Sequence, residues 1–435
     1  MKIIKKCFIL LLCTALLTGC SLISGGDDLL QTPKPSENFT LLQEQLEKII
    51  SEGKTYVTPQ SGSYRNTVTF EDIDSDGADE AIVFLRDGTG GKIYVYAFAW
   101  EDGEYKEIGS IAGPGSAVGS MSFLTVEDGQ EKLLVLTWTL SNEVKQGLTV
   151  CRVRDHKLEE LLSTTCTNYI VSDMDRDNTE ELFTLSYDNT ERKTASVYDY
   201  DNEKMLLLSQ TDATQDVQAI ANITAGQLND SEMQAVFVDN KFENDNGMQT
   251  DIYVLDGSTL RNVATSSNTS TYRSTSLYFC EDIDGDGSIE VPQLHALPGY
   301  EDREAAETLW MIDWYRYGMG DEAKLVHTIY DSPTEGWMLE FPKEWRNNVT
   351  AVSISQSGRN ETVFMEQDGL QEQILTIYSF TGEDRKQEAS ADGLIELGST
   401  SDICFAAKLG DGNTQYDMTE KEVQRAFTVI TNEWK

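Results

Sequence analysis

The chain has 435 residues, of which 74 are acidic and 34 are basic, so its formal charge at neutral pH is −40. A protein that follows the phosphates of a nucleic acid needs a dense basic surface, and the absence of any such cluster of Lys and Arg excludes nucleic acid as a partner. The hydrophobic fraction of 39% is that of a folded protein, and the length suits two domains or one repeat architecture.

Residues 1–19 have the features of an export signal, with lysines near the start and an apolar run over residues 7–17. This run is too short for a comfortable membrane span. The ending LTGC at residues 17–20 resembles the bacterial lipobox, which implies cleavage before Cys20 and lipid attachment to its sulfur. We therefore expect a protein anchored by its lipid to the outer face of a bacterial cell membrane, the alternative being an ordinary cleaved signal.

Residues 20–37 are rich in Gly, Ser, Asp and Pro and have no apolar periodicity, which predicts a flexible tether. A helix is expected next, because Phe39, Leu42, Leu46 and Ile49 fall at helical spacing and Gly53 follows as a stop signal.

Three acidic loops follow, each with acidic residues at relative positions 1, 3, 5 and 9. They are residues 72–80, 173–181 and 282–290. Two related segments, residues 124–132 and 226–234, have lost most of these acids and fall between the loops, so that the repeat length is roughly fifty residues.

Each repeat continues into hairpin-forming strands with alternating aromatic or β-branched residues. The expected second strands are residues 93–100, 148–153, 195–200, 251–255 and 309–315. A unit of three or four antiparallel strands cannot cover both of its faces alone, so the pattern predicts sheets that stack on one another.

The D-x-D-x-D-G-x-x-[DE] loop, repeated at this spacing before a strand, resembles the FG-GAP/VCBS repeats of β-propellers, including those of integrin heads and many bacterial surface proteins. The resemblance covers roughly residues 60–335. It implies a mainly β fold with a β-propeller of about five to seven blades and a calcium ion in each intact loop. Residues 38–335 are accordingly expected to form the propeller with its N-terminal helix.

Carboxylates at alternate positions of a tight loop converge on one point, and Ca²⁺ takes six to eight oxygen ligands. Gly77 and Gly287 stand where such a loop turns sharply, and Asn178 tolerates the same left-handed conformation. We expect two or three structural Ca²⁺ sites rather than solvated acidic turns. The predicted ligands are Asp72, Asp74, Asp76, Glu80, Asp173, Asp175, Asp177, Glu181, Asp282, Asp284, Asp286 and Glu290.

Residues 336–435 no longer follow the repeat and are expected to form a small α+β domain, or in part a closing blade. Strands are predicted at residues 349–354, 361–365, 374–378 and 403–407. A helix is expected from Thr419 to Trp434, because Thr419 and Glu422 have the spacing of a capping box. The aromatic residues from Trp337 to Trp345 are expected to pack in a core, the alternative being that they line a ligand groove. Their segment is similar to one in exported repeat lipoproteins of Gram-positive bacteria.

No nucleophile elbow, zinc-binding helix or phosphate-binding loop is present, and the three histidines are not at metal-ligand spacing. Four cysteines remain after Cys20, and they form two disulfides in one of three connectivities or are buried singly. They are Cys151, Cys166, Cys280 and Cys404.

Together these features predict a lipid-anchored cell-surface protein whose calcium-stabilised propeller binds or scaffolds an envelope protein or glycan, with no enzymatic activity required. The alternative is an envelope glycan hydrolase or lyase that uses carboxylates on the propeller face. The sequence leaves the identity of the ligand and the oligomeric state open.

Overall fold

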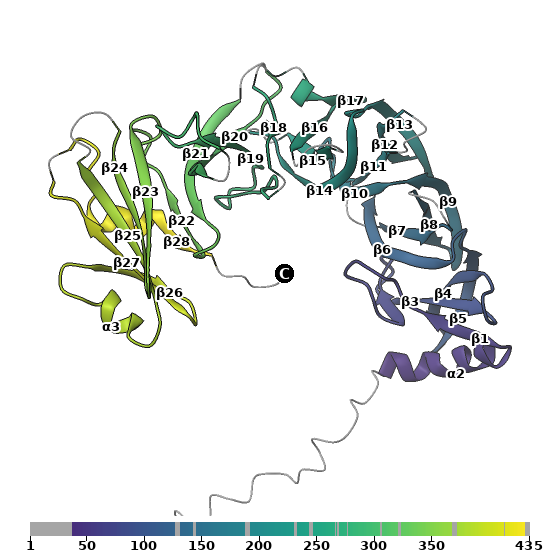
Figure 1. Ribbon diagram of the computed structural model, residues 1–435. Coiled ribbons are helices and arrows are strands. Elements are labelled where there is room, and N and C mark those ends of the chain that lie inside the picture. The colour runs from purple at the N-terminus through teal and green to yellow at the C-terminus, as the bar shows by residue number, and fades with distance from the viewer. Residues whose placement is uncertain are drawn as a thin grey trace, which may run out of the picture.

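A computed structural model describes residues 37–126, 131–141, 145–187, 192–229, 233–242, 247–265, 267, 269–275, 277–304, 307–320, 323–367, 372–412 and 414–430. The predicted export signal, Cys20 and nearly all of the tether lie outside this part of the chain. The protein is mainly β and consists of antiparallel sheets that follow one another along an arc (Figure 1). Within the described residues, no helix has the length and apolar character needed to cross a membrane.

Helix α2 (Glu37–Ser51) begins the described chain, as the apolar spacing predicts. Leu42 and Leu46 are fully buried against one face of the first sheet. Gly53 then adopts a φ of 94°, which an L-residue rarely does, and the chain turns into the first strand.

Five successive sheets come from the predicted repeats. The first contains β1 (Lys54–Val57), β2 (Val68–Glu71), β3 (Glu80–Asp87), β4 (Ile93–Glu101) and β5 (Glu104–Ala112), with β1 and β2 both paired to β3. The second contains β6 (Ala117–Val126), β7 (Glu131–Thr139), β8 (Gln146–Arg154) and β9 (Lys157–Cys166). The third contains β10 (Asn168–Ser172), β11 (Glu181–Ser186), β12 (Thr194–Asp201) and β13 (Lys204–Asp212).

The fourth sheet contains β14 (Val217–Gln227), β15 (Gln234–Phe242), β16 (Met248–Asp256), β17 (Thr259–Asn262) and β18 (Tyr272–Arg273), with the 3₁₀ turn η1 (Val263–Thr265) after β17. The fifth contains β19 (Val291–Ala296), β20 (Trp310–Arg316), β21 (Lys324–Ser332), β22 (Trp337–Glu340) and β28 (Phe427–Val429). All five predicted second strands are confirmed as β4, β8, β12, β16 and β20.

The sixth sheet is formed by β23 (Val349–Gln356), β24 (Arg359–Glu366), β25 (Gln373–Thr381), β27 (Ile403–Leu409) and β26 (Ile395–Ser399). Helix α3 (Arg385–Ala389) contacts β25 and β27, and Ala389 is buried with Phe380, Cys404 and Ala406. The two ends of the stack are therefore covered, by α2 on the first sheet and by α3 on the last.

Alternation along the strands explains why the sheets stack. In β3, Ile82 and Phe84 pack against the second sheet, whereas Ala81, Val83 and Leu85 pack against α2. The same alternation recurs along the array, and each pair of neighbouring sheets shares one apolar core.

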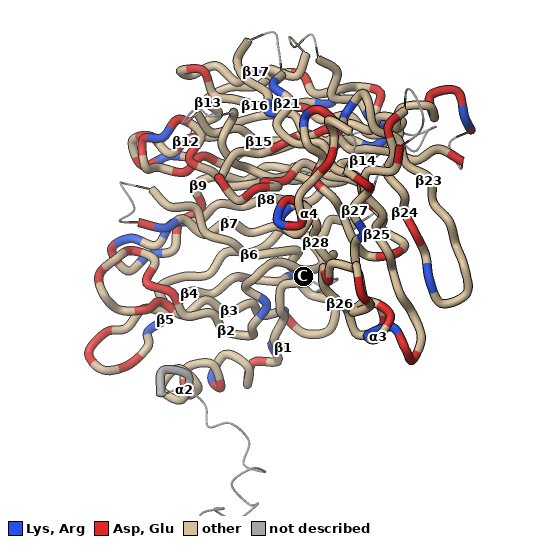
Figure 2. The backbone as a smooth tube through the Cα atoms, turned by 90° about the vertical axis from the view of Figure 1, so that its left-hand side faces the viewer, with Lys and Arg blue, Asp and Glu red and all other residues tan. Residues whose placement is uncertain are grey.

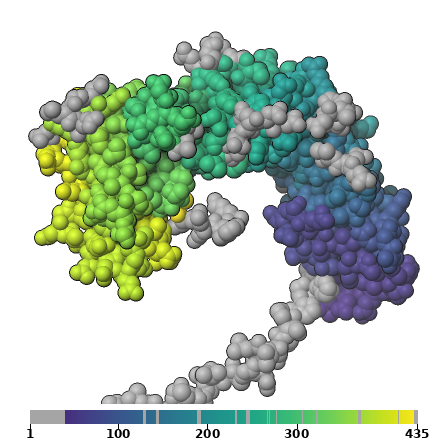
Figure 3. Space-filling model, in the orientation of Figure 1, coloured from purple at the N-terminus to yellow at the C-terminus, as the bar shows by residue number. Residues whose placement is uncertain are grey.

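The sheets do not close into a ring. Figure 3 shows an open arc, with the first sheet and the last at its two separated ends. The coarse prediction of a mainly β protein with several stacked antiparallel sheets is thus confirmed, although most of the sheets have five strands rather than three or four. A closed β-propeller is absent from the described residues. In Figure 2, acidic residues outnumber basic ones and gather in the loops at the strand ends.

The C-terminal helix is shorter than predicted. Helix α4 spans Glu420–Ala426, and the predicted capping box of Thr419 with Glu422 is present. The chain then leaves the helix, and Phe427 enters both the core and strand β28, which pairs with β22. Burial of this Phe and the added strand pairing override the helical periodicity beyond Ala426, and residues 431–435 lie outside the described part.

Strand β22 begins one residue beyond the expected domain boundary at residues 335/336, yet it pairs with β21 in the fifth sheet. Residues 336–435 therefore contribute two strands, β22 and β28, to the fifth sheet and all the strands of the sixth. Trp337 and Trp345 are buried in the core between these two sheets, as predicted.

All four cysteines are buried and none is in a disulfide. Each belongs to a different apolar cluster along the array, which separates them from one another. The structure thus selects single burial over the disulfide alternatives.

Replacing Leu46 with Ala should lower the free energy of unfolding by roughly 2–5 kcal/mol, because it removes methyl groups from the buried contact between α2 and the first sheet. The matched control is Leu41→Ala on the exposed side of the same helix, where a change within about 0.5 kcal/mol is expected. Urea denaturation followed by circular dichroism measures both. Equal losses for the two variants would contradict the packing of α2.

Candidate metal sites and binding cleft

The three acidic loops occupy equivalent places in three sheets. Loop 72–80 joins β2 to β3, loop 173–181 joins β10 to β11, and loop 282–290 leads directly into β19. In each case the ninth residue is a buried glutamate where the next strand starts: Glu80, Glu181 or Glu290.

The same hydrogen bonds shape all three loops. In the first, Asp72 Oδ2 accepts from the backbone N–H of Gly77 at 3.2 Å, and Glu80 Oε2 accepts from that of Ile73 at 3.0 Å. Asp74 Oδ1 accepts from the N–H of Asp76 at 3.3 Å. The other two loops repeat these contacts. One oxygen of each carboxylate is thereby held by the backbone.

Positive φ angles at positions 4 and 6 produce the tight turn. The prediction for position 6 is confirmed by Gly77, Asn178 and Gly287, with φ of 92°, 68° and 92°. Position 4 was not predicted, because Ser75 and Arg176 are ordinary L-residues whose left-handed conformation has no sequence signal.

Three of the four predicted ligands in each loop lie together, with oxygens within 4.8 Å of one another. The clusters are Asp72 with Asp74 and Glu80, Asp173 with Asp175 and Glu181, and Asp282 with Asp284 and Glu290. Each cluster could hold a metal ion. The position-5 residues Asp76, Asp177 and Asp286 fall outside them, and one oxygen of each accepts from the N–H two residues later at 2.8 Å.

The first loop fits a cation particularly well. Asp72 Oδ1 is buried and has no hydrogen-bond partner among the described residues. The pKa of Glu80 is raised to about 7, mainly by burial and in smaller part by the neighbouring Asp74, Asp76 and Asp72. A bound cation would supply the missing partner and favour the ionised form, and an all-oxygen donor set suits Ca²⁺ or a similarly hard ion.

The second loop carries an additional acidic neighbour. Burial is the main cause that raises the pKa of Glu181 to about 8, and Asp175 and Asp199 add to the rise. Asp199 lies on β12 and was not a predicted site residue.

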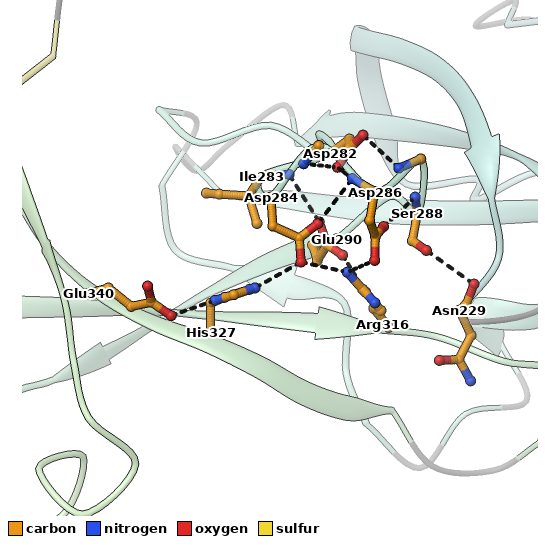
Figure 4. A network of polar contacts seen from close by, with 12 residues as sticks. Asn229, Asp282, Ile283, Asp284, Asp286, Ser288, Glu290, Arg316, His327 and Glu340 are labelled. Carbon is orange, nitrogen blue, oxygen red and sulfur yellow. Dashed lines mark hydrogen bonds and ion pairs between the residues drawn. The ribbon is translucent and has the colours of Figure 1, made fainter. Parts of the chain in front are cut away.

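The third loop differs, because basic side chains occupy it (Figure 4). Arg316 Nη2 lies 2.9 Å from Asp284 Oδ2 and 2.8 Å from Asp286 Oδ2, and Arg316 Nε donates to Glu290 Oε1 at 2.5 Å. His327 Nε2 is 3.1 Å from Asp284 Oδ2. Sequence analysis missed both residues, since they lie on β20 and β21 and reach the loop only because β20 pairs with β19 and β21 pairs with β20.

The two acid-poor repeats retain only parts of this arrangement. Residues 127–130 and 230–232, which include Asp128 and Asp230, lie outside the described part of the chain. Glu131, at the start of β7, is buried and forms an ion pair with Arg154 on β8. Gln234 stands at the corresponding position in the fourth sheet.

A cleft of about 420 Å³ lies at the opposite end of the fifth sheet from the third loop. Trp310 at the start of β20, Tyr330 near the end of β21 and the turn after β21 line it, together with Ser274, Thr275, Leu277 and Tyr278. Leu277 at its rim is 72% exposed.

Two carboxylates border this cleft. Asp331 Oδ2 accepts from the Tyr278 hydroxyl at 2.7 Å, while Asp331 Oδ1 is buried without a hydrogen-bond partner in the described structure. Burial raises the pKa of Asp331. Glu335 Oε2 accepts from Trp337 Nε1 at 2.9 Å. No Lys, Arg or His is among the described residues that line the cleft.

A second cleft, of about 480 Å³, lies between the β21–β22 region and α4. It carries Arg346, whose Nε donates to Asp313 at 2.8 Å, and His327, whose Nδ1 is 2.8 Å from Glu340 Oε1. These polar groups already have partners, whereas the first cleft presents an unpartnered acceptor.

No family model and no curated protein matches this chain. Among solved structures it is similar to the exotype rhamnogalacturonan lyase YesX, with 14% identity and a TM-score of 0.29 over 72% of this chain and 61% of that one. A Bacillus licheniformis rhamnogalacturonan lyase, PL11, is 9% identical with a TM-score of 0.30, over 84% and 92%. Fructan 1-exohydrolase IIa from Cichorium intybus is 12% identical with a TM-score of 0.25, over 74% and 69%.

The chain spans about three fifths of the length of the rhamnogalacturonan lyases YesX and YesW. TM-scores this low carry no argument about the activity of this chain, which has to come from its own residues.

Excess calcium should raise the melting temperature relative to excess chelator, because a bound cation offsets the repulsion within the first two loops. Asp74→Asn and Asp175→Asn should each reduce the rise. Asp102→Asn, in an exposed hairpin turn, is the control that removes a charge without touching a cluster. Differential scanning calorimetry measures the effect, and identical melts with calcium and chelator would leave the loops as plain acidic turns.

In chelator, stability should depend on pH through Glu80 and Glu181, whose pKa values rise from 4.5 to about 7 and about 8 on folding. A raised carboxyl pKa means that the folded state binds more protons. The stabilisation is therefore complete below pH 4.5 and is lost as the pH rises through these folded values.

Melting curves between pH 4.5 and 9 measure this loss. The double variant Glu80→Gln/Glu181→Gln should reduce the decline, whereas the exposed pair Glu104→Gln/Glu107→Gln should leave it nearly unchanged. An equal pH dependence in both double variants would refute the assignment.

Proposed function

We propose that this protein is an exported, lipid-anchored binding protein of the bacterial envelope that holds a neutral glycan in the cleft on its fifth sheet. Calcium in the acidic loops stiffens the array. Cys20 is the attachment point of the lipid, and residues 20–37 are the tether that holds the folded part away from the membrane surface.

The cleft is the observation that carries this proposal. Sugars present apolar ring faces and a rim of hydroxyl groups, and proteins bind small molecules in concave sites with an apolar lining and a few placed polar groups. Trp310 supplies a large aromatic surface, and Asp331 Oδ1 is an acceptor for which no described residue provides a donor. A sugar hydroxyl would supply that donor after a small movement of the side chain.

The charges around the cleft favour a neutral ligand. Asp331 and Glu335 border it, and none of the described residues that line it is cationic, so an anionic sugar such as a uronate would meet like charge without compensation. The formal charge of −40 adds a long-range repulsion of anionic polymers.

A second candidate is a glycan hydrolase or lyase that uses these same two carboxylates. Asp331 and Glu335 border one cleft, and the raised pKa of Asp331 is a property of general acids. Binding alone requires no further group, so it remains the main proposal.

Binding is tested by affinity electrophoresis of the purified protein in gels that contain neutral or uronate-rich polysaccharides. We expect retardation by a neutral polysaccharide, and at least a tenfold loss of affinity in Trp310→Ala, or about 1.4 kcal/mol. Tyr56→Ala, which removes an exposed aromatic ring from β1, is the matched control.

Unchanged retardation of the Trp310→Ala variant would exclude the cleft as the binding site. New reducing ends or unsaturated products that vanish in Asp331→Asn would instead identify the protein as an enzyme.

A further inference from the structure

The five repeat sheets differ at one pair of positions that their strand registers align. The first residue of the pair lies at the start of β3, β7, β11 or β15, or one residue before β19, and the other lies opposite it on the next strand. These pairs are obtained by extending the register of each strand pair beyond its last hydrogen-bonded residues, toward the end where the acidic loops lie. They are Glu80 with Ala99, Glu131 with Arg154, Glu181 with Asp199, Gln234 with Leu255, and Glu290 with Arg316.

Each of the four glutamates in these pairs is at most 4% exposed. An ionised carboxylate at such a depth is costly unless a cation compensates it. The residue opposite is neutral in the first sheet, acidic in the third and basic in the second and fifth. In the fourth sheet, Gln234 and Leu255 remove the charge altogether.

Arg316 compensates the negative charge of the third loop and contacts the carboxylate oxygens that a metal ion would need, so it excludes an ion from this loop. Arg316 is 5% exposed, and its guanidinium forms ion pairs with Asp284 Oδ2, Asp286 Oδ2 and Glu290 Oε1. The opposite oxygen of each of these carboxylates already accepts a backbone N–H. Since Ca²⁺ requires six to eight oxygens, it could enter only after Arg316 had left.

The first two loops contain no such substitute. Among the described residues, Asp72, Asp74 and Glu80 form no ion pair with Lys, Arg or His, and neither do Asp173, Asp175 and Glu181. A guanidinium is permanently charged, so Arg316 compensates its loop at every pH and at every calcium concentration.

We propose that the residue opposite the buried glutamate decides whether a sheet takes a metal ion, and that Arg316 is the resident cation of loop 282–290. Of the three acidic loops, loops 72–80 and 173–181 then bind metal, whereas loop 282–290 does not. The fifth sheet, which carries the cleft, keeps its loop in place without calcium. This inference concerns the metal sites alone and does not depend on what the cleft binds.

Metal stoichiometry in the full-length protein tests the proposal, measured by calcium titration calorimetry and by metal analysis after gel filtration. The wild type should bind two ions and Arg316→Ala three, with a lower melting temperature in chelator that calcium restores. Ala99→Arg, which transfers the guanidinium to the first sheet, should reduce the count to one.

Arg154→Ala is the matched control, because it removes an arginine from the equivalent place in a sheet that lacks the acidic loop. It should lower the melting temperature without adding a calcium ion. Should Arg316→Ala not fold even with calcium, Arg316→Met keeps the volume of the side chain and is expected to give the same third ion.

Three ions in the wild type, or two ions in a folded Arg316 variant, would overturn the proposal. If the wild type and all variants bind no ion, it is overturned as well, since the first two loops would then need no cation. Loss or retention of glycan binding bears on the cleft alone, so the two proposals fail independently.

Discussion

Each repeat sheet in this protein is apolar on both faces, so none of them is stable unless a neighbour covers each face. The alternation of Ala81, Ile82, Val83, Phe84 and Leu85 in β3 divides one strand between two cores, one with α2 and one with the second sheet. Repetition of this constraint produces the array, and the two end sheets require caps, which α2 and α3 supply. With both ends covered, closure into a ring is not needed to protect the apolar faces.

A second constraint acts at the loop ends of the sheets, where a carboxylate is buried and its charge has to be compensated. The sheets compensate this buried charge in different ways. The first and third have an acidic cluster suited to a cation, and the second and fifth have an arginine. The fourth has an uncharged pair in place of the carboxylate. The fourth sheet places its buried ion pair elsewhere, between Asp239 and Arg273 at 2.7 Å. Asp239 there also accepts from Thr250 and from the backbone N–H of Cys280. The buried charge of Asp239 is therefore surrounded by donors.

The fifth sheet carries both a charge-compensated acidic loop and the candidate binding cleft. Its loop end is held by Arg316, while its other end forms the cleft around Trp310 and Asp331. Strand β28 pairs with β22 and fastens the C-terminal segment to the same sheet. Under our proposals, calcium governs the stability of the first and third sheets, whereas the surface that binds the ligand is fixed by ion pairs and strand pairing alone.

Local patterns in the sequence were sufficient for the second strands of the repeats, for α2 and for the turn at position 6 of the acidic loops, because each of these follows from the spacing of neighbouring residues. The positive φ at Gly77 and the capping box of Thr419 are of this kind. Other features depend on strand register between distant segments, so only the tertiary structure decided them. Arg316 reaches Glu290 across 26 residues and His327 reaches Asp284 across 43. The open arc, the early end of α4 and the cleft arise in the same way, since burial and pairing with remote strands overrode or added to what the local sequence specifies.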